Sequence, residues 1–281
     1  MGKQQNIIAA VVTDSHIGST LGLRPQYVTR DDGDVSKATR AQTWMLARWK
    51  DDYWAEVRER RKALDALLVL LFAGELFDNI HHGTTQLWSH NPADWYKAAD
   101  ELFTPIMEEV DQAFFLRGTE VHTGPSACLD EAWVNQWDNV AHDPTTDAAT
   151  WWYLDIELEG VRIEGAHHGP IGRMEHTTGN ALNKVASQVM GQAIKMGRKP
   201  PVLYFQAHNH VYAENNPAMP IRVVALPAWQ LCTGYVSKVS PWTRLADIGG
   251  VILTCEDGAF DYDVRLYKPT PRRPWTLPKK P

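Results

Sequence analysis

The sequence predicts an α/β fold in which buried strands alternate with helices. Three apolar strand patterns in the first half are separated by helical patterns, and each strand runs directly into polar residues and glycine. Strands that alternate with helices form β-α-β units and a parallel sheet, and binding sites form at the carboxyl ends of such strands. The pattern therefore predicts both the layering and the sheet edge at which a functional site would lie.

The first strand, over residues 7–12, is followed at once by Asp14, Ser15 and His16. Residues i and i+2 point the same way if the extended geometry persists, so Asp14 and His16 can face a common point. One carboxylate and one imidazole in this arrangement suit a metal ion. An isolated D-x-H pair is weak evidence, so the interpretation depends on whether similar groups recur downstream.

The other elements follow in order along the chain. The polar composition of residues 19–37 predicts an exposed connection. Apolar residues at three- and four-residue spacing then predict a helix from Ala38 to Val57. Further helices are predicted at residues 95–110 and 182–196. Strands are predicted at 67–73, 113–116, 151–158, 161–166, 202–206, 221–226, 250–255 and 260–267. Turns at Glu159-Gly160 and Asp257-Gly258 join two of the strand pairs.

Composition indicates an ordinary soluble globular protein, with one domain over residues 1–267 and a Pro-rich basic tail over 268–281. The 281 residues are 44% hydrophobic and 22% charged, and the formal net charge of -6 gives no bulk attraction to a polyanion. Three cysteines that are far apart and without C-x-x-C spacing indicate neither a disulfide framework nor a thiolate zinc site. We expect a cytoplasmic protein without a targeting or membrane-spanning segment.

Carboxylates, imidazoles or both follow five of the predicted strands. In chain order the junctions read D-x-H, G-E-x-x-D, G-T-E-x-H, H-H-G and H-N-H. Mixed His and carboxylate donors suit Mn, Fe, Zn or Ni, and a bridging carboxylate lets two ions lie about 3.5–4 Å apart. Such a pair lowers the pKa of a bound water and orients a phosphoryl oxygen. The recurrence therefore predicts a binuclear metal centre.

In this order the junctions resemble the calcineurin-like metallophosphoesterase superfamily, and more closely a branch encoded by phages and prophages. The stretches RGTEVH, HHGTTQ, AHHGP and LPAWQ carry the closer resemblance. The resemblance covers about residues 7–258 and implies a four-layer α/β/β/α sandwich with the metals between the sheet ends. It also implies two divalent ions, with Mn2+ as the first choice and Fe, Zn or Ni as alternatives.

Carried over by position, the resemblance implies a set of metal ligands. Asp14, His16 and His210 would hold one ion, Glu75 would bridge, and His168 and His208 would hold the second. Thr119 stands in the position of an Asn ligand. His168 is preferred over His167 because it directly precedes glycine, and His167 would then support it. A structural alternative is that Asp14 and Glu75 cap helices.

Three positions differ from the family pattern. Glu75 stands where the family has Asp, Thr119 where it has Asn, and Glu120 where it has the His that protonates the leaving group. We expect the imidazole of His122 to be the general acid instead. Glu120 is kept as an alternative acid or as a ligand of the second ion.

Several other groups have open interpretations. His81 and His82 lie on a predicted loop, either solvated or in contact with substrate. Four aromatics could stack bases at the rim of a cleft or belong to the core or an oligomer contact: Trp88, Trp95, Trp229 and Trp242. Four cationic residues of the tail could contact phosphates or lie in solvent: Arg272, Arg273, Lys279 and Lys280.

The leading hypothesis is a metal-dependent phosphoesterase that hydrolyses a phosphodiester or phosphomonoester with a metal-bound hydroxide. Nucleic acid or a nucleotide is the expected substrate class if the gene is viral, in which case the protein would act in the host cytoplasm. A homo-oligomer is compatible with the sequence. The second hypothesis is a catalytically weakened binding or assembly module of a phage or prophage, motivated by the substitutions at positions 75, 119 and 120.

Overall fold

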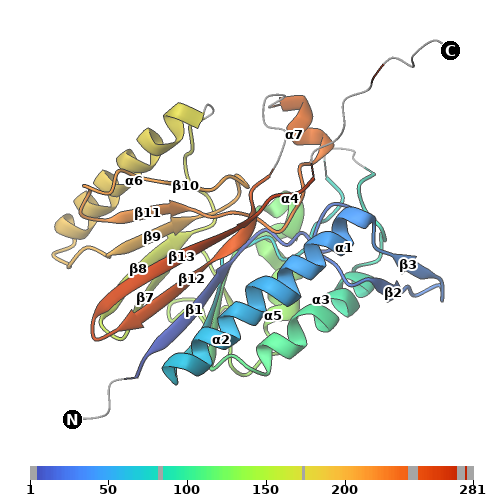
Figure 1. The fold of residues 1–281 in the computed structure, drawn as a ribbon, viewed down its shortest axis with the longest axis horizontal. Coiled ribbons are helices and arrows are strands. Elements are labelled where there is room, and N and C mark those ends of the chain that lie inside the picture. The colour runs from blue at the N-terminus through green and yellow to red at the C-terminus, as the bar shows by residue number, and fades with distance from the viewer. Residues whose placement is uncertain (1–4, 82–84, 173–174, 240–245, 271–275, 277–281) are drawn as a thin grey trace.

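Two stacked β-sheets form the centre of the molecule, with helices on both outer faces (Figure 1). The computed structural model describes residues 5–81, 85–172, 175–239, 246–270 and 276. Six residues with predicted roles lie outside the described residues: His82, Trp242, Arg272, Arg273, Lys279 and Lys280.

The first sheet has the order β13-β12-β1-β4-β5-β6. Its parallel strands are β1 (Ile7–Val12), β4 (Leu67–Phe72), β5 (Gln112–Leu116) and β6 (Thr150–Trp151). The antiparallel hairpin of β12 (Ile248–Glu256) and β13 (Ala259–Tyr267) completes it, with Ile7 of β1 opposite Cys255. The predicted parallel sheet is confirmed for four strands, and a hairpin extends it at one edge.

The second sheet has the order β10-β11-β9-β8-β7. Its strands are β7 (Leu154–Leu158), β8 (Val161–Ala166), β9 (Leu203–Gln206), β10 (Ala213–Glu214) and β11 (Arg222–Ala225). The prediction of one strand over residues 151–158 was wrong. Trp151 pairs with Leu116 of the first sheet, whereas Leu154 pairs with Gly165 of the second. The chain therefore crosses from one sheet to the other at Trp152 and Tyr153.

Both faces of β1 are buried, which explains its uninterrupted apolar sequence. Ile8, Ala10 and Val12 lie in the core beneath the helices, whereas Ile7, Ala9 and Val11 lie in the core between the sheets. The four-layer α/β/β/α prediction is confirmed, with a third apolar cluster under α6 (Glu175–Lys195) on the opposite face. The single-domain assignment over residues 1–267 stays a prediction.

The helix predicted from Ala38 contains a π-helical segment. It consists of α1 (Arg40–Ala47), the π-helix η1 (Arg48–Tyr53) and α2 (Trp54–Leu64). Thr39 and Gln42 form a capping box at its start. The wider π turn brings Trp49, Tyr53 and Trp54 to the buried side. The region is therefore helical as predicted, with a change of helix type at its aromatic cluster.

The remaining helices are mostly short. They are α3 (Pro92–Met107), α4 (Glu120–Thr123), the 3-10 helix η2 (Pro125–Ala127), α5 (Cys128–Val134) and α7 (Gly234–Val239). The connection predicted as exposed contains a hairpin of β2 (Tyr27–Thr29) and β3 (Val35–Lys37). Within the described residues, no helix has the length and apolar character needed to cross a bilayer.

Trp95 and Trp229 belong to the core, which confirms the structural interpretation of these two residues. The Trp229 ring lies 4.8 Å from that of Trp49, between ring centroids. Trp88 packs against the same core, and the guanidinium of Arg24 covers its ring at 4.3 Å from the centroid. None of these three rings is freely available for stacking.

Trp229→Ala should lower the free energy of unfolding by about 3–5 kcal/mol, because it removes a fully buried indole from an aromatic cluster. Urea denaturation measures this change. Tyr27→Ala, at a ring that is 54% exposed, is the control and should change the free energy by less than about 0.5 kcal/mol. Equal stability of Trp229→Ala and the wild type would contradict the core role.

Candidate metal centre

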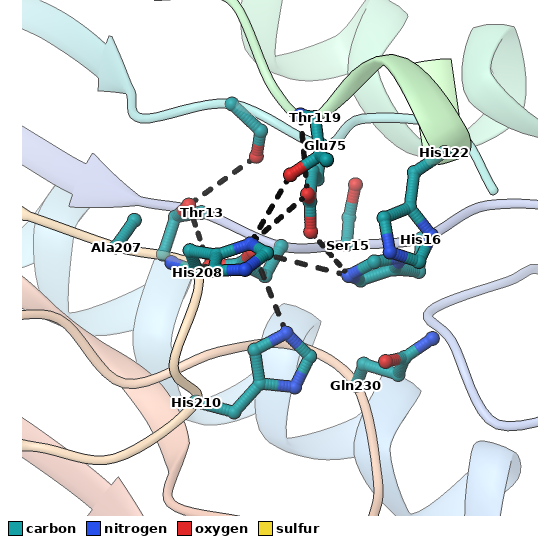
Figure 2. A network of polar contacts seen from close by, with 12 residues as sticks. Thr13, Ser15, His16, Glu75, Thr119, His122, Ala207, His208, His210 and Gln230 are labelled. Atoms are coloured by element: carbon teal, nitrogen blue, oxygen red, sulfur yellow. Dashed lines mark hydrogen bonds and ion pairs between the residues drawn. The ribbon is translucent and has the colours of Figure 1, made fainter. Parts of the chain in front are cut away.

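The predicted metal-binding side chains follow strands whose ends lie at one edge shared by the two sheets. Figure 2 shows five of them from close by: His16, Glu75, Thr119, His208 and His210. Asp14 and His16 follow β1, Glu75 follows β4, and Thr119 follows β5. On the second sheet, His167 and His168 follow β8, and His208 and His210 follow β9. These strands run parallel within each sheet, so their carboxyl ends meet at this edge.

The first group consists of Asp14, His16, Glu75 and His210, whose donor atoms all lie within 4.8 Å of one another. His16 Nε2 lies 2.9 Å from Glu75 Oε2, and His210 Nε2 lies 3.4 Å from Asp14 Oδ1. All four residues were predicted as ligands, and the structure brings them together.

The second group consists of His167, His168 and His208, again within 4.8 Å of one another. Glu75 Oε1 lies 3.0 Å from His167 Nε2 and 3.3 Å from His208 Nδ1. The Thr119 hydroxyl lies 3.0 Å from His168 Nε2 and 3.2 Å from His208 Nδ1. Glu75 therefore faces the first group with one carboxylate oxygen and the second group with the other.

His167 is buried beside Glu75, whereas His168 is exposed. The His167 Nδ1–H donates to the Ala73 carbonyl at 2.7 Å, which leaves Nε2 directed at Glu75. The sequence motif favoured His168 because this residue directly precedes glycine. The period of two along β8 would have indicated His167, because Val161, Ile163 and Gly165 are buried in turn.

Five residues of the two groups adopt the left-handed backbone region without being glycine. Their φ values are 53° at Asp14, 46° at His16, 60° at Glu75, 72° at His208 and 54° at His210. Such conformations cost about 1–3 kcal/mol each and are retained where the surrounding structure or the function requires them. Their concentration at one edge indicates that the positions of these side chains are functionally constrained.

Glycines allow the close approach of the strands at this point. A Cβ atom on Gly118 would lie 2.5 Å from Glu75 Cγ, and one on Gly74 would lie 2.6 Å from His167 Nδ1. Gly74 also has a φ of +100°, which L side chains rarely adopt. The conformation and contacts of Glu75 therefore depend on both glycines.

The ionised carboxylate of Glu75 lies between the first and second groups of side chains. Burial alone would raise the pKa of Glu75, but the imidazoles of His167 and His16 hold that pKa well below its ordinary value. Burial lowers the pKa of His167, whereas the attraction of Glu75 raises it, with a net result of about 9. Protonated imidazoles thus balance the Glu75 charge, a balance that a bound divalent cation would also provide.

Buried atoms that lack a hydrogen bond test whether the site fits metal ions. Asp14 Oδ1, His16 Nε2 and His167 Nε2 are buried and make no hydrogen bond to any residue that the structure describes, although each lies 2.9–3.4 Å from an oppositely charged group. These contacts are ionic and lack hydrogen-bond geometry, and metal coordination would satisfy the same oxygen and nitrogen donors. The residues therefore fit divalent transition-metal ions.

A third group surrounds Asp78, the last residue of the G-E-x-x-D motif, for which the sequence predicted no role. Its Oδ1 lies 2.7 Å from His122 Nδ1, 2.9 Å from His81 Nε2 and 3.7 Å from His16 Nδ1. Although burial alone would raise the Asp78 pKa, hydrogen bonds from His122, His16 and His81 lower it. Burial lowers the pKa of His122, which favours its neutral form. His81 thus contacts the site through Asp78.

Glu120 does not join these groups. Its side chain is exposed at the start of α4, and its carboxylate accepts a hydrogen bond from the Ser126 N–H at 3.4 Å. Neither Asp14 nor Glu75 is the N-cap of a helix in the described part of the chain. The capping alternative for these two carboxylates therefore finds no support.

Asp130 of α5 holds the turn that follows Glu75. The Leu76 and Phe77 N–H groups donate to its carboxylate at 3.2 and 3.3 Å. Burial raises the pKa of Asp130 to about 8. No sequence signal predicts this role, because Asp130 lies far from Glu75 along the chain and belongs to no motif.

Comparisons with known proteins add only weak similarities. No family model matches the sequence, and no curated protein matches it significantly. A Streptococcus pneumoniae protein described as a predicted phosphoesterase has a TM-score of 0.39 at 12% identity, covering 96% of this chain and 95% of its own.

Two further solved structures are similar at the same level. Vps29 of Entamoeba histolytica, in complex with Zn2+, has a TM-score of 0.39 at 8% identity, covering 92% and 98% of the two chains. A 5′-nucleotidase of Candida albicans has a TM-score of 0.41 at 11% identity, over 81% of this chain and 47% of that one. Scores this low support no inference about function, so the assignment depends on the geometry of the site.

Asp130→Ala should lower the free energy of unfolding by about 1–3 kcal/mol, because two buried N–H groups next to Glu75 lose their acceptor. Chemical denaturation measures this effect. Glu59→Ala, on the exposed side of α2, is the matched control with an expected change below about 0.5 kcal/mol. Similar stabilities of the two variants would show that Asp130 does not hold the turn.

Proposed function

We propose that this protein is a metal-dependent phosphoesterase that binds two divalent cations, one at the first group of side chains and one at the second. The observation that carries the proposal is the position of Glu75, which faces His16 at 2.9 Å with Oε2 and His167 at 3.0 Å with Oε1. A carboxylate in this position can bridge two cations. Membership of the calcineurin-like superfamily is part of the proposal and rests on the order of the motifs.

The residues that would hold the ions follow from the two groups. Asp14, His16, His210 and Glu75 would hold one ion. Glu75, His167 and His208 would hold the other, with Thr119 and His168 beside it. We thus add His167 to the ligands expected from the sequence, because it is buried and its Nδ1–H is fixed by a carbonyl. Mn2+ remains the first choice, with Fe, Zn and Ni as alternatives.

A pair of bound divalent cations supplies an activated water and offsets charge on the phosphoryl group. The chain itself supplies the acid. Asp78 binds Nδ1 of His122, which leaves Nε2 of this imidazole to hold the proton that passes to the leaving-group oxygen. Burial lowers the pKa of His122 and the Asp78 carboxylate raises it, and the net result is a lowered pKa, so the protonated imidazole releases its proton readily. This arrangement supports His122 over Glu120 as the general acid.

Metal analysis and hydrolysis test the binuclear centre. We expect two ions per chain in the Mn2+-loaded protein and hydrolysis of p-nitrophenyl phosphate or bis-p-nitrophenyl phosphate above background. Glu75→Ala should weaken metal affinity by at least about 100-fold, because it removes the shared carboxylate. His142→Gln, at a half-exposed imidazole outside all three groups, is the control.

Two outcomes would contradict the proposal. The first is a metal-loaded protein without hydrolysis of either ester. The second is a Glu75→Ala variant with wild-type metal content and activity. One ion or none per chain, together with no hydrolysis, would instead favour the metal-stabilised binding or assembly module.

His122→Ala should lower kcat by about 100-fold or more, because it removes the group that protonates the leaving oxygen. Its metal content should stay at the wild-type value, since His122 is absent from both proposed ligand sets. Glu120→Ala should lower kcat by less than about tenfold, because its carboxylate lies outside the groups. A greater loss at Glu120 would reverse the assignment of the acid.

Four further parts of the proposal rest on the sequence alone: the phage or prophage branch, the cytoplasmic location, a homo-oligomeric state, and nucleic acid or a nucleotide as substrate.

A further inference from the structure

Trp152 is an exposed tryptophan with a cation on one side of its ring. Its side chain is 55% exposed, and Arg117 Cζ lies 4.9 Å from the ring centroid. A tryptophan is usually largely buried, and an exposed one with a polar neighbour often belongs to a binding surface. Three of the four tryptophans considered above for base stacking, Trp88, Trp95 and Trp229, instead pack in or against the core, and the fourth lies outside the described residues.

The backbone places Trp152 at the edge that holds the metal-binding groups. On the first sheet, Trp151 pairs with Leu116, and Thr119 follows Leu116 shortly after the strand ends. On the other sheet, Leu154 pairs with Gly165, and His168 follows Gly165 shortly after the strand ends. The crossing at Trp152 and Tyr153 therefore lies at the same edge of the sheets as the second group of imidazoles.

Arg117 is held in place by a chain of hydrogen bonds. Its Nε donates to the Thr150 carbonyl and to the Thr150 hydroxyl, each at 3.1 Å. The Glu131 carboxylate in turn accepts from the Thr150 N–H at 2.9 Å and from the Ala149 N–H at 2.8 Å. Within the described residues, the two terminal nitrogens of Arg117 make no hydrogen bond and remain available to a ligand.

We propose that Arg117 and Trp152 form a subsite for the base of a nucleotide or of a nucleic-acid end, next to the metal centre. The proposal rests on the proposed phosphoesterase function and specifies its substrate class. A base stacks on the indole, which Arg117 supports from one side through a cation–π contact. The free guanidinium N–H groups donate to phosphate or base oxygens.

Charge and geometry favour this class of ligand. The net charge of -6 attracts no polyanion over long distances, so binding of a nucleotide requires a local cation. A planar ring and a fixed guanidinium together match a planar base joined to a phosphate. Because the subsite and the imidazoles lie at the same edge of the sheets, one ligand that contacts both is the expected arrangement.

Two esters with the same leaving group test the subsite: thymidine 5′-(p-nitrophenyl phosphate) and methyl p-nitrophenyl phosphate. The ratio of kcat/KM for the thymidine ester to that for the methyl ester isolates the contribution of the base. Trp152→Ala should lower this ratio by about tenfold, mainly through KM, and Trp152→Phe should restore most of it. Arg117→Gln should lower the ratio in the same direction.

Tyr27→Ala is the matched control. Tyr27 is also exposed, at 54%, and also has a cation near its ring, Lys37 Nζ at 5.8 Å from the centroid. It lies on the β2–β3 hairpin, away from the edge of the metal-binding groups (Figure 1). The ratio should be the same in this variant as in the wild type. An unchanged ratio in Trp152→Ala, or an equal fall in Tyr27→Ala, would overturn the proposal.

A binding measurement keeps this test separate from that of the phosphoesterase function. Calorimetric titration should show that thymidine 5′-monophosphate binds the wild type about tenfold more tightly than ribose 5-phosphate does, and that Trp152→Ala removes this preference. Equal affinities in the wild type would overturn the subsite. Failure to hydrolyse either ester, with the nucleotide preference intact, would overturn the phosphoesterase function and leave the subsite standing.

Discussion

The buried, ionised carboxylate of Glu75 is the constraint on which the rest of the site depends. An ion taken out of water costs several kcal/mol unless charges and hydrogen bonds replace its hydration. Here His16 and His167 supply charge, the Thr119 N–H donates to Oε1 at 3.2 Å, and Asp130 holds the turn that follows. Two sheets, two glycines and one helix therefore converge on a single side chain.

Two of the three positions that differ from the family pattern are connected in the folded protein. Glu75 reaches both groups of imidazoles, and Thr119 contacts it through the backbone N–H while its hydroxyl contacts His168 and His208. Glu120 lies outside these contacts, but α4 brings His122 to Asp78, so an imidazole lies at the third group. This candidate acid and the two-sided contacts of Glu75 are why we favour an enzyme over a weakened relative.

The same edge of the sheets also accounts for the proposed substrate subsite. The crossing between the sheets joins the end of β6 to the start of β7, which places Trp152 at the same edge as the candidate metal-binding groups. Arg117 is held there by Thr150, which Glu131 holds in turn, and neither residue belongs to those groups. The proposed catalytic site and the proposed base subsite therefore depend on different hydrogen bonds.

The sequence by itself determined most of the strands, the parallel arrangement of the first three and the polar residues at the strand ends. Apolar runs such as residues 7–12 and 67–73 are local signals, and D-x-H and H-N-H each bring two side chains to one strand end. Only the tertiary structure distinguished the buried His167 from the exposed His168, brought Asp78 and Asp130 to their hydrogen-bond partners, and divided residues 151–158 between the sheets. These features depend on burial and on contacts between residues far apart in the chain, which neither periodicity nor motif spacing records.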